Sequence, residues 1–251
     1  MKKFLTSTGF IAISIFLLHS CKKFSSCRLS GVKQTEQYVL SGFNKVETSR
    51  NIELHIQQAT SQSITVEADK NLLADFKYRI SDSTLYLDYD AGCIFRDEET
   101  KITVLLKTDQ LRQIRNSSHF GIYSVNTLTF PEVTLISENY RQPDSPALGD
   151  FILNVDNQRI KIISNNLSQF QITGRTQQLQ IHFYGGFSRF EGQNLTANDI
   201  YVFHRSSNDL LLFPVNSLSG EIRSTGNVLI FNEPNSINVA EHFTGTLIRV
   251  Y

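Results

Sequence analysis

The chain has 251 residues, of which 40% are hydrophobic and 19% are charged. This length suits one or two domains, and the apolar content is enough for a substantial core, which excludes an intrinsically disordered protein. Lys plus Arg and Asp plus Glu are equal, at 24 each, so a basic surface for nucleic acid is not expected. With 13 glycines, 5 prolines and no short period, the chain is neither collagen-like nor of low complexity.

Residues 1–20 have the pattern of a bacterial lipoprotein signal peptide. Two lysines precede a short apolar run, residues 10–18, which falls short of the about 20 residues that a membrane-spanning helix needs. The following Leu18-His19-Ser20-Cys21 resembles a lipobox, from which only His19 departs. We therefore expect cleavage after Ser20 and acylation of Cys21, which would anchor the chain in a membrane. An ordinary signal peptide that is cleaved elsewhere is the alternative.

Residues 21–37 are predicted to be a tether, and residues 38–251 a single folded domain. The tether segment carries Lys, Ser and Gln and shows no sustained apolar alternation. It contains Cys27, whereas Cys93 lies in the domain, and export would permit a disulfide between the two. Whether they pair stays open, because a flexible tether gains little from such a link.

From about residue 36 onward, apolar and polar residues alternate. This pattern is typical of strands that have one buried face. Polar breaks separate the predicted strands. One helical turn is predicted at residues 69–75, with Asp69 as its N-cap. The clearest strands lie at residues 52–56, 64–68, 76–80, 85–89 and 102–106.

Residues 150–235 contain an internal repeat. Turn residues occur at positions 165, 185, 206 and 225, each between two short apolar strands. One such repeat cannot bury its inward face alone, but stacked repeats share a continuous core, so the pattern predicts a β-solenoid with an N-terminal strand-rich portion. A meandering antiparallel β-sandwich or roll is the alternative, because the period alone does not distinguish the two. Residues 137–149, with two prolines, are predicted to be an exposed, protease-sensitive loop.

Several short segments occur in the order that is found in a known family of exported proteins. They are residues 68–73 (Ala-Asp-Lys-Asn-Leu-Leu), 82–87 (Asp-Ser-Thr-Leu-Tyr-Leu) and 220–228 (Gly-Glu-Ile-Arg-Ser-Thr-Gly-Asn-Val). With them, residues 38–251 resemble the putative auto-transporter adhesin, head GIN domain family, whose members are exported and often lipid-anchored proteins of Bacteroidetes. The resemblance implies an all-β fold, a right-handed parallel β-helix, in a family whose molecular function is poorly defined. Asn and Ser pairs at 165–166 and 206–207 replace the Ser-Gly turns that the family favours.

The segment after Cys21 bears on which side of the outer membrane the protein occupies. Among Bacteroidetes lipoproteins, acidic residues directly after the lipidated cysteine accompany export to the surface. Residues 22–26, Lys-Lys-Phe-Ser-Ser, contain none. The sequence therefore favours an outer-membrane lipoprotein on the periplasmic face over one on the surface. Asp82-Ser83-Thr84 also resembles a Bacteroidetes O-glycosylation site, but so short a match leaves modification of Ser83 open.

No catalytic residues, metal ligands or cofactor are predicted. A β-helical polysaccharide hydrolase or lyase needs carboxylates that converge on one face, and the acids of the repeats form no column and no adjacent pair. The acidic run at residues 97–99 lacks the pattern of a calcium loop and is expected to be a solvated turn. No Cys-x-x-Cys or His-x-x-x-His spacing occurs. Enzymatic activity is therefore the less favoured alternative.

An aromatic-rich stretch at residues 183–203 gives a faint signal for binding. Exposed aromatic side chains on a β-face suit stacking on a sugar or contact with a protein partner. Tyr184 and Tyr201 are the candidates for such ligand contacts. The other aromatic residues of the stretch are expected to pack inward, among them Phe183, Phe187 and Phe190.

The sequence thus predicts a lipid-anchored, non-enzymatic and adhesin-like binding module of the cell envelope. Its partners would be the membrane, through Cys21, and a glycan or an envelope protein, but not a nucleic acid. A carbohydrate-active β-helical enzyme and a purely structural envelope component are the alternatives. The sequence leaves the ligand and the oligomeric state open.

Overall fold

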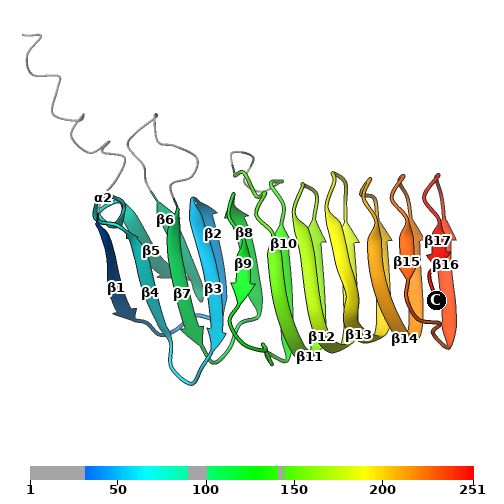
Figure 1. Ribbon diagram of the computed structural model, residues 1–251, viewed down its shortest axis with the longest axis horizontal. Coiled ribbons are helices and arrows are strands. Elements are labelled where there is room, and N and C mark those ends of the chain that lie inside the picture. Colours follow the sequence, from blue (N-terminus) through cyan, green and yellow to red (C-terminus); the bar gives the residue numbers. More distant parts are fainter. Residues whose placement is uncertain (1–31, 90–100, 141–142, 144) are drawn as a thin grey trace, which may run out of the picture.

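The computed structural model describes residues 32–89, 101–140, 143 and 145–251. Nearly all regular structure in these residues is β-strand, with one short helix, α2 (Lys70–Leu73). The described strands hydrogen-bond into one 17-stranded sheet that curls back on itself. Figure 1 shows them side by side along the long axis, from β1 at one end to β16 and β17 at the other, with β6 and β7 between β4–β5 and β2–β3. The predicted all-β class is therefore confirmed.

Four long strands carry the repeat that the sequence shows. Each pairs in parallel with the next. Phe151 lies beside Phe170, Phe170 beside Phe190, and Phe190 beside Leu210, so the chain returns to the same lateral position once in every repeat. The antiparallel sandwich or roll is thus excluded for this part of the chain. The four strands are β11 (Phe151–Ser164), β12 (Gln169–Phe183), β13 (Arg189–His204) and β14 (Leu210–Ile222).

The sheet has two layers, and each long strand turns near its middle from one into the other. Its first half lies in what we call the second layer, and its second half lies in the first layer. We call one complete repeat through both layers a coil. In the second layer the strand order is β1 (Lys33–Val39), β4 (Ser63–Asp69), β7 (Ile102–Thr108), β3 (Ile52–Gln58), β9 (Ile122–Ser124), the first halves of β11 to β14, β15 (Val228–Ile230) and β17 (Leu247–Arg249). In the first layer it is β5 (Phe76–Ser81), β6 (Thr84–Tyr89), β2 (Lys45–Arg50), β8 (Gln113–Ser118), β10 (Glu132–Ser137), the second halves of β11 to β14, and β16 (Ser236–Glu241).

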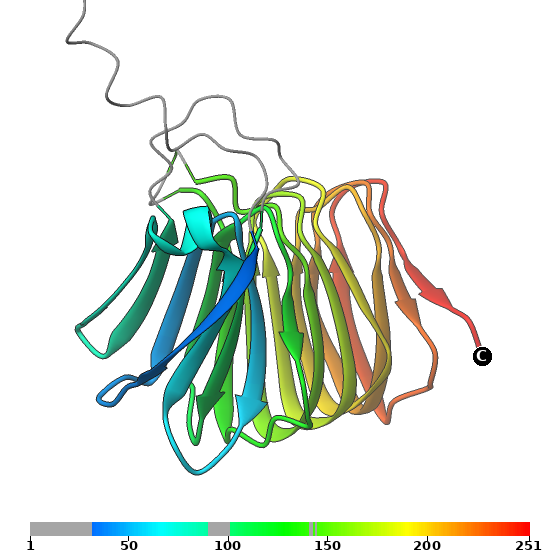
Figure 2. The same ribbon diagram turned by 60° about the vertical axis from the view of Figure 1, so that its left-hand side comes forward.

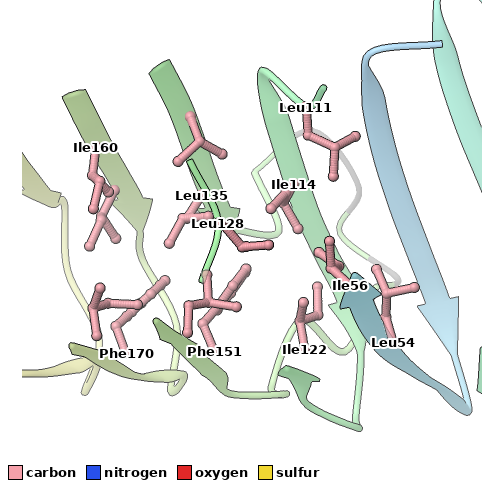
Figure 3. Packing of buried hydrophobic residues seen from close by; sticks show 14 of the residues in the cluster. Leu54, Ile56, Leu111, Ile114, Ile122, Leu128, Leu135, Phe151, Ile160 and Phe170 are labelled. Atoms are coloured by element: carbon pink, nitrogen blue, oxygen red, sulfur yellow. The ribbon is translucent and has the colours of Figure 1, made fainter. Parts of the chain in front are cut away.

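The interior between the two layers is filled by the apolar residues of the alternating pattern. Along the second half of β12, for example, Leu179 and Ile181 are buried, while Gln180 between them is only partly buried. Burial of each such side chain contributes roughly 1.5–3 kcal/mol. The rings of Phe151 and Phe170 stack with their centroids 4.8 Å apart, one coil on the next. Figure 3 shows the two opposing rows, Ile114, Leu135 and Ile160 from the first layer and Ile122, Phe151 and Phe170 from the second.

Buried serines line the turns where one coil passes into the next. The hydroxyls of Ser137 and Ser168 lie 2.5 Å apart, and those of Ser164 and Ser188 lie 2.6 Å apart. The Ser206 hydroxyl donates to the carbonyl oxygen of Ser188 at 2.6 Å. Small hydroxyl side chains therefore satisfy polar groups that would otherwise be buried without partners at these corners.

Parallel stacking begins earlier in the chain than the visible repeat. β2 and β3 form one coil, and β8 and β9 form the next, with Thr48 beside Asn116 although they are far apart in sequence. Between these coils the chain inserts β4, α2, β5, β6 and β7. Strand β1 and the hairpin β5–β6 lie at the N-terminal end of the stack (Figure 2). In β11 to β14, strands that pair with each other are one repeat apart in the sequence. Between β3 and β8, by contrast, five further elements intervene, so the insertion hides the period in this part of the chain.

Two N-terminal boundaries differ from the sequence predictions. The tether predicted at residues 21–37 extends too far, because residues 33–37 belong to β1 and pair antiparallel with β4. The helical turn is shorter than residues 69–75. Asp69 does stand at the N-cap of α2, but its side chain makes no capping hydrogen bond.

The segment 137–149 is not exposed throughout, contrary to the prediction. Ala147 and Gly149 are buried, and the carbonyl oxygen of Ala147 accepts a hydrogen bond from the Ser137 hydroxyl at 3.0 Å. A side chain on Gly149 would place its Cβ 1.9 Å from the carbonyl oxygen of Phe120. The second half of this segment is therefore packed against the strand ends rather than free.

Some sequence predictions lie outside the described residues, namely the signal peptide at 1–20, the lipidation of Cys21, the pairing of Cys27 with Cys93 and the acidic run at 97–99. Ser83 is described and exposed, at a turn where Asp82 and Ser83 have φ angles of 50° and 57°. Two consecutive positive φ angles suit a tight hairpin turn of type I′. Among the described residues, no helix has the length and apolar character that crossing a bilayer requires.

Candidate functional site

The outer side of the first layer carries a line of residues that crosses the strands. We call these residues the cross-strand row. Since neighbouring strands lie about 4.8 Å apart, a ligand along this row would contact several coils. Strand pairing places its members side by side in the order Tyr86, Glu47, Arg115, Ile136, Ile163, His182 and Phe203.

An aromatic cluster occupies the end of the row that lies on β12 and β13. The ring of His182 is 5.5 Å from that of Tyr201 and 6.0 Å from that of Tyr184, measured between centroids. Tyr184 in turn lies 5.5 Å from Phe203. Tyr184 is 50% exposed and Tyr201 is 38% exposed, so both rings are accessible to a ligand. Burial, followed by the charge of Lys161, lowers the pKa of His182, which keeps this imidazole neutral near pH 7.

A hollow of about 410 Å³ adjoins this cluster, and Tyr184 belongs to both. We call it the Tyr184 hollow. Its lining combines the two isoleucines of the row with polar and charged groups, a composition that suits a ligand with both apolar and polar surfaces. The lining residues are Arg115, Ile136, Glu138, Tyr140, Ile163, Asn165 and Tyr184.

A buried ion pair forms one wall of the Tyr184 hollow. Arg115 Nη2 donates to Glu138 Oε1 at 2.6 Å, and Arg115 Nη1 donates to the carbonyl oxygen of Glu138 at 3.1 Å. The two side chains are only 9% and 12% exposed. The backbone N–H of Tyr140 donates to the other carboxylate oxygen of Glu138 at 2.7 Å. This wall is therefore held in one geometry by several charge-assisted hydrogen bonds.

A second polar cluster lies on the outer side of the second layer. Lys101 Nζ donates to Glu53 Oε2 at 2.8 Å, and His55 Nε2 lies 3.0 Å from Glu53 Oε1. The ring of Tyr123 stacks on His55 with a centroid distance of 5.0 Å. Burial raises the pKa of Glu53, but the hydrogen bonds from Lys101 and His55 outweigh it and hold that pKa below its ordinary value. The carboxylate is thus occupied by structural ion pairs.

The chemistry of the Tyr184 hollow suits binding better than catalysis. Glycoside hydrolysis uses two carboxyl groups on either side of the bond that is cleaved. Among the residues that line the hollow, Glu138 supplies the carboxylate, and Arg115 holds it in an ion pair. In the part of the chain that the structure describes, no group of three or more His, Cys, Asp or Glu side chains could hold a metal ion.

The structure brings the two tyrosines singled out in the sequence together around His182. Phe183 and Phe190 are buried as expected, whereas Phe187 is exposed and not part of the core, because it stands in the turn after β12. Sequence patterns alone did not reveal Arg115, Ile136, Glu138 or Tyr140. The partial signal was an Arg and an Ile in outward positions of alternating strands, which becomes meaningful only once the strand pairing is known.

The fold has relatives among solved structures. A putative adhesin from Bacteroides fragilis superposes with a TM-score of 0.79 at 19% sequence identity, over 88% of this chain and 99% of that one. A putative adhesin from Parabacteroides merdae gives 0.63 at 14% identity, over 87% and 96% of the two chains. A putative lipid binding protein from Parabacteroides distasonis gives 0.63 at 12% identity, over 87% and 97%. At such low sequence identities, these comparisons show a shared fold and nothing more.

No curated protein matches the chain. The model of one protein family, described as "Putative auto-transporter adhesin, head GIN domain", matches residues 42–234. This match spans most of the chain and agrees with the adhesin names of the structural relatives. The chain therefore belongs to the auto-transporter adhesin, head GIN domain family.

Proposed function

We propose that the protein is a non-enzymatic, adhesin-like binding module of the cell envelope that holds a glycan on the outer side of its first layer. The observation that carries the proposal is the position of Tyr184, which is half-exposed and shared by the aromatic cluster and the hollow of about 410 Å³. An exposed aromatic ring offers an apolar face to a sugar ring, and polar groups such as those of Asn165 and Arg115 suit its hydroxyls.

We further propose that the coils form a right-handed parallel β-helix. The supporting observations are the parallel pairing from β10 to β16 and the regular return of the chain to the same lateral position from β11 to β14. In such a helix each coil presents the same outward positions as its neighbour, so weak contacts recur at regular intervals. This repetition suits a ligand of many similar units.

The proposed location is the outer membrane, with Cys21 acylated and the domain on the periplasmic face. The sequence around Cys21 and the membership in a family of adhesins support an envelope-associated protein. Replacement of Cys21 by Ala should move the protein from the membrane fraction to the soluble fraction of lysed cells. If the variant stayed with the membranes, the lipid anchor would be wrong.

Binding of the detergent-purified full chain to a glycan array tests the function. We expect saturable binding to at least one glycan without its breakdown, and at least about tenfold weaker binding for Tyr184→Ala and Tyr201→Ala, which corresponds to about 1.4 kcal/mol. Tyr251→Ala is the matched control, since Tyr251 is as exposed but lies at the C-terminal end. Cleavage of any glycan would favour the enzyme alternative. Binding of an envelope protein but of no glycan would favour a structural role.

A further inference from the structure

A second hollow, of about 500 Å³, lies on the first layer near its N-terminal end. It resembles the Tyr184 hollow in composition, since both combine two tyrosines, an arginine and at least one acidic side chain. We call it the Tyr86 hollow. Its lining residues are Glu47, Ser49, Lys77, Tyr78, Arg79, Tyr86, Leu87 and Asp88, from strands β2, β5 and β6.

The polar groups of the Tyr86 hollow are held in place by their neighbours. The guanidinium carbon of Arg79 lies 3.6 Å from the centroid of the Tyr86 ring, a cation–π contact that fixes both side chains. The Ser49 hydroxyl donates to the carboxylate of Asp88, which ties β2 to β6. The hollow thus presents the stacked Arg79 guanidinium and Tyr86 ring beside hydrogen-bond donors and acceptors. A ligand rich in hydroxyl groups needs such a combination of a flat surface and polar partners.

Strand pairing puts the two hollows on one line. Glu47 lines the Tyr86 hollow and Arg115 lines the Tyr184 hollow, and these two residues are direct register partners on β2 and β8. Both belong to the cross-strand row, which runs on through Ile163 to His182 and the aromatic cluster. From β6 to β12 the row crosses five strand spacings, which amounts to about 24 Å.

We propose that the Tyr86 hollow is a second subsite of one binding track, so that the ligand is an extended glycan chain laid across the strands rather than a single sugar or disaccharide. This inference rests on the proposed glycan-binding function. One chain that fills both hollows gains the second set of contacts without a second loss of translational freedom, so affinity rises with ligand length. A short oligosaccharide fills one hollow only and lacks this gain.

The test uses the full chain on an array of linear glucans, mannans, galactans and xylans, each graded in length from disaccharides to octasaccharides. We expect affinity to rise at least about tenfold from the shortest to the longest ligand of the type that binds. Arg79→Ala should abolish this rise and leave disaccharide binding in the Tyr184 hollow unchanged. Tyr86→Ala should also abolish the rise, whereas Tyr184→Ala should weaken binding at every length. Circular dichroism spectra and unfolding midpoints like those of the unaltered chain would show that the variants remain folded.

The possible outcomes distinguish failure of the second subsite from failure of the proposed glycan-binding function. Length-independent binding that Tyr184→Ala weakens and Arg79→Ala does not would overturn the second subsite and leave the proposed function standing. Absence of binding to every glycan, or binding that Tyr184→Ala leaves intact, would overturn the proposed function and the inference with it. Retention of an extended protein segment in place of any glycan would likewise overturn both.

Discussion

Acidification should destabilise the protein through His204, the last residue of β13. The residue is 0% exposed, its ring centroid lies 6.3 Å from that of Phe183, and neither ring nitrogen has a hydrogen-bond partner of normal geometry among the described residues. Burial lowers the pKa of His204 to about 4, against the smaller opposing effects of Asp209 and of the nearby backbones of Gly226 and Asn208. The folded protein therefore holds this imidazole in its neutral form.

The size of the effect follows from the difference between this pKa of about 4 and the value of about 6.5 for a histidine in an unfolded chain. Because the unfolded chain binds the proton more readily, stability is fully present above about pH 6.5 and is lost as the pH falls toward about 4. At about 1.4 kcal/mol per pKa unit, the free energy of unfolding should fall by about 3 kcal/mol over this range.

Urea unfolding at about pH 7.5 and about pH 4 measures this loss, with circular dichroism as the signal because the chain has no tryptophan. His204→Leu removes the titrating group and should reduce the pH dependence by about 3 kcal/mol. His119→Leu, at an exposed position, is the control for the loss of a histidine. The carboxylates titrate in all three proteins, so the difference isolates His204. An equal pH dependence in the unaltered chain and in His204→Leu would refute the reasoning.

Three further substitutions test the backbone, the buried ion pair and the binding surface. Gly220→Ala should lower the free energy of unfolding by about 2 kcal/mol or more. The reason is that Gly220 has a φ of 129° and an added Cβ would lie 1.9 Å from the carbonyl oxygen of Val202. An unchanged urea midpoint would contradict this expectation. Arg115→Met should cost about 3–5 kcal/mol by leaving the Glu138 carboxylate without its arginine, and the added Glu138→Gln should restore most of that loss. A double variant no more stable than Arg115→Met alone would show that the charge is not the cause. Tyr184→Ala should change stability by less than about 0.5 kcal/mol, since the ring is half-exposed; a larger shift in thermal unfolding would make Tyr184 a structural residue.

The parallel pairing of β11 to β14 was predictable because the information for it is local. Alternation in β11 to β14 marks which residues face inward, and turn residues at 165, 185, 206 and 225 mark where each coil ends. The earlier coils were not predictable in the same way. The residues of β2 pair with those of β8 across an insertion of five elements, and no sequence period survives such an interruption.

The candidate site was predictable only in part for a related reason. Tyr201 occupies an outward position of the strongly alternating strand β13, and Tyr184 directly follows the last residue of β12, so their exposure follows from the sequence. The ion pair of Arg115 with Glu138 depends on the register between β8 and β10, because Glu138 directly follows the last residue of β10. This register is not encoded in a short stretch of residues, so the hollow can be recognised only when the strands are placed side by side.

The unequal sequence distance between neighbouring coils has a consequence for how the chain reaches its native state. In β11 to β14 each coil finds its neighbour after a single short repeat, and the entropy lost on closing such loops is modest. The pairing of β2 with β8 must instead close a much longer loop, from Thr48 to Asn116, that has strands of its own to form. Local contacts speed folding and distant ones slow it. The C-terminal coils should therefore form the nucleus, onto which the N-terminal coils and their insertion assemble last.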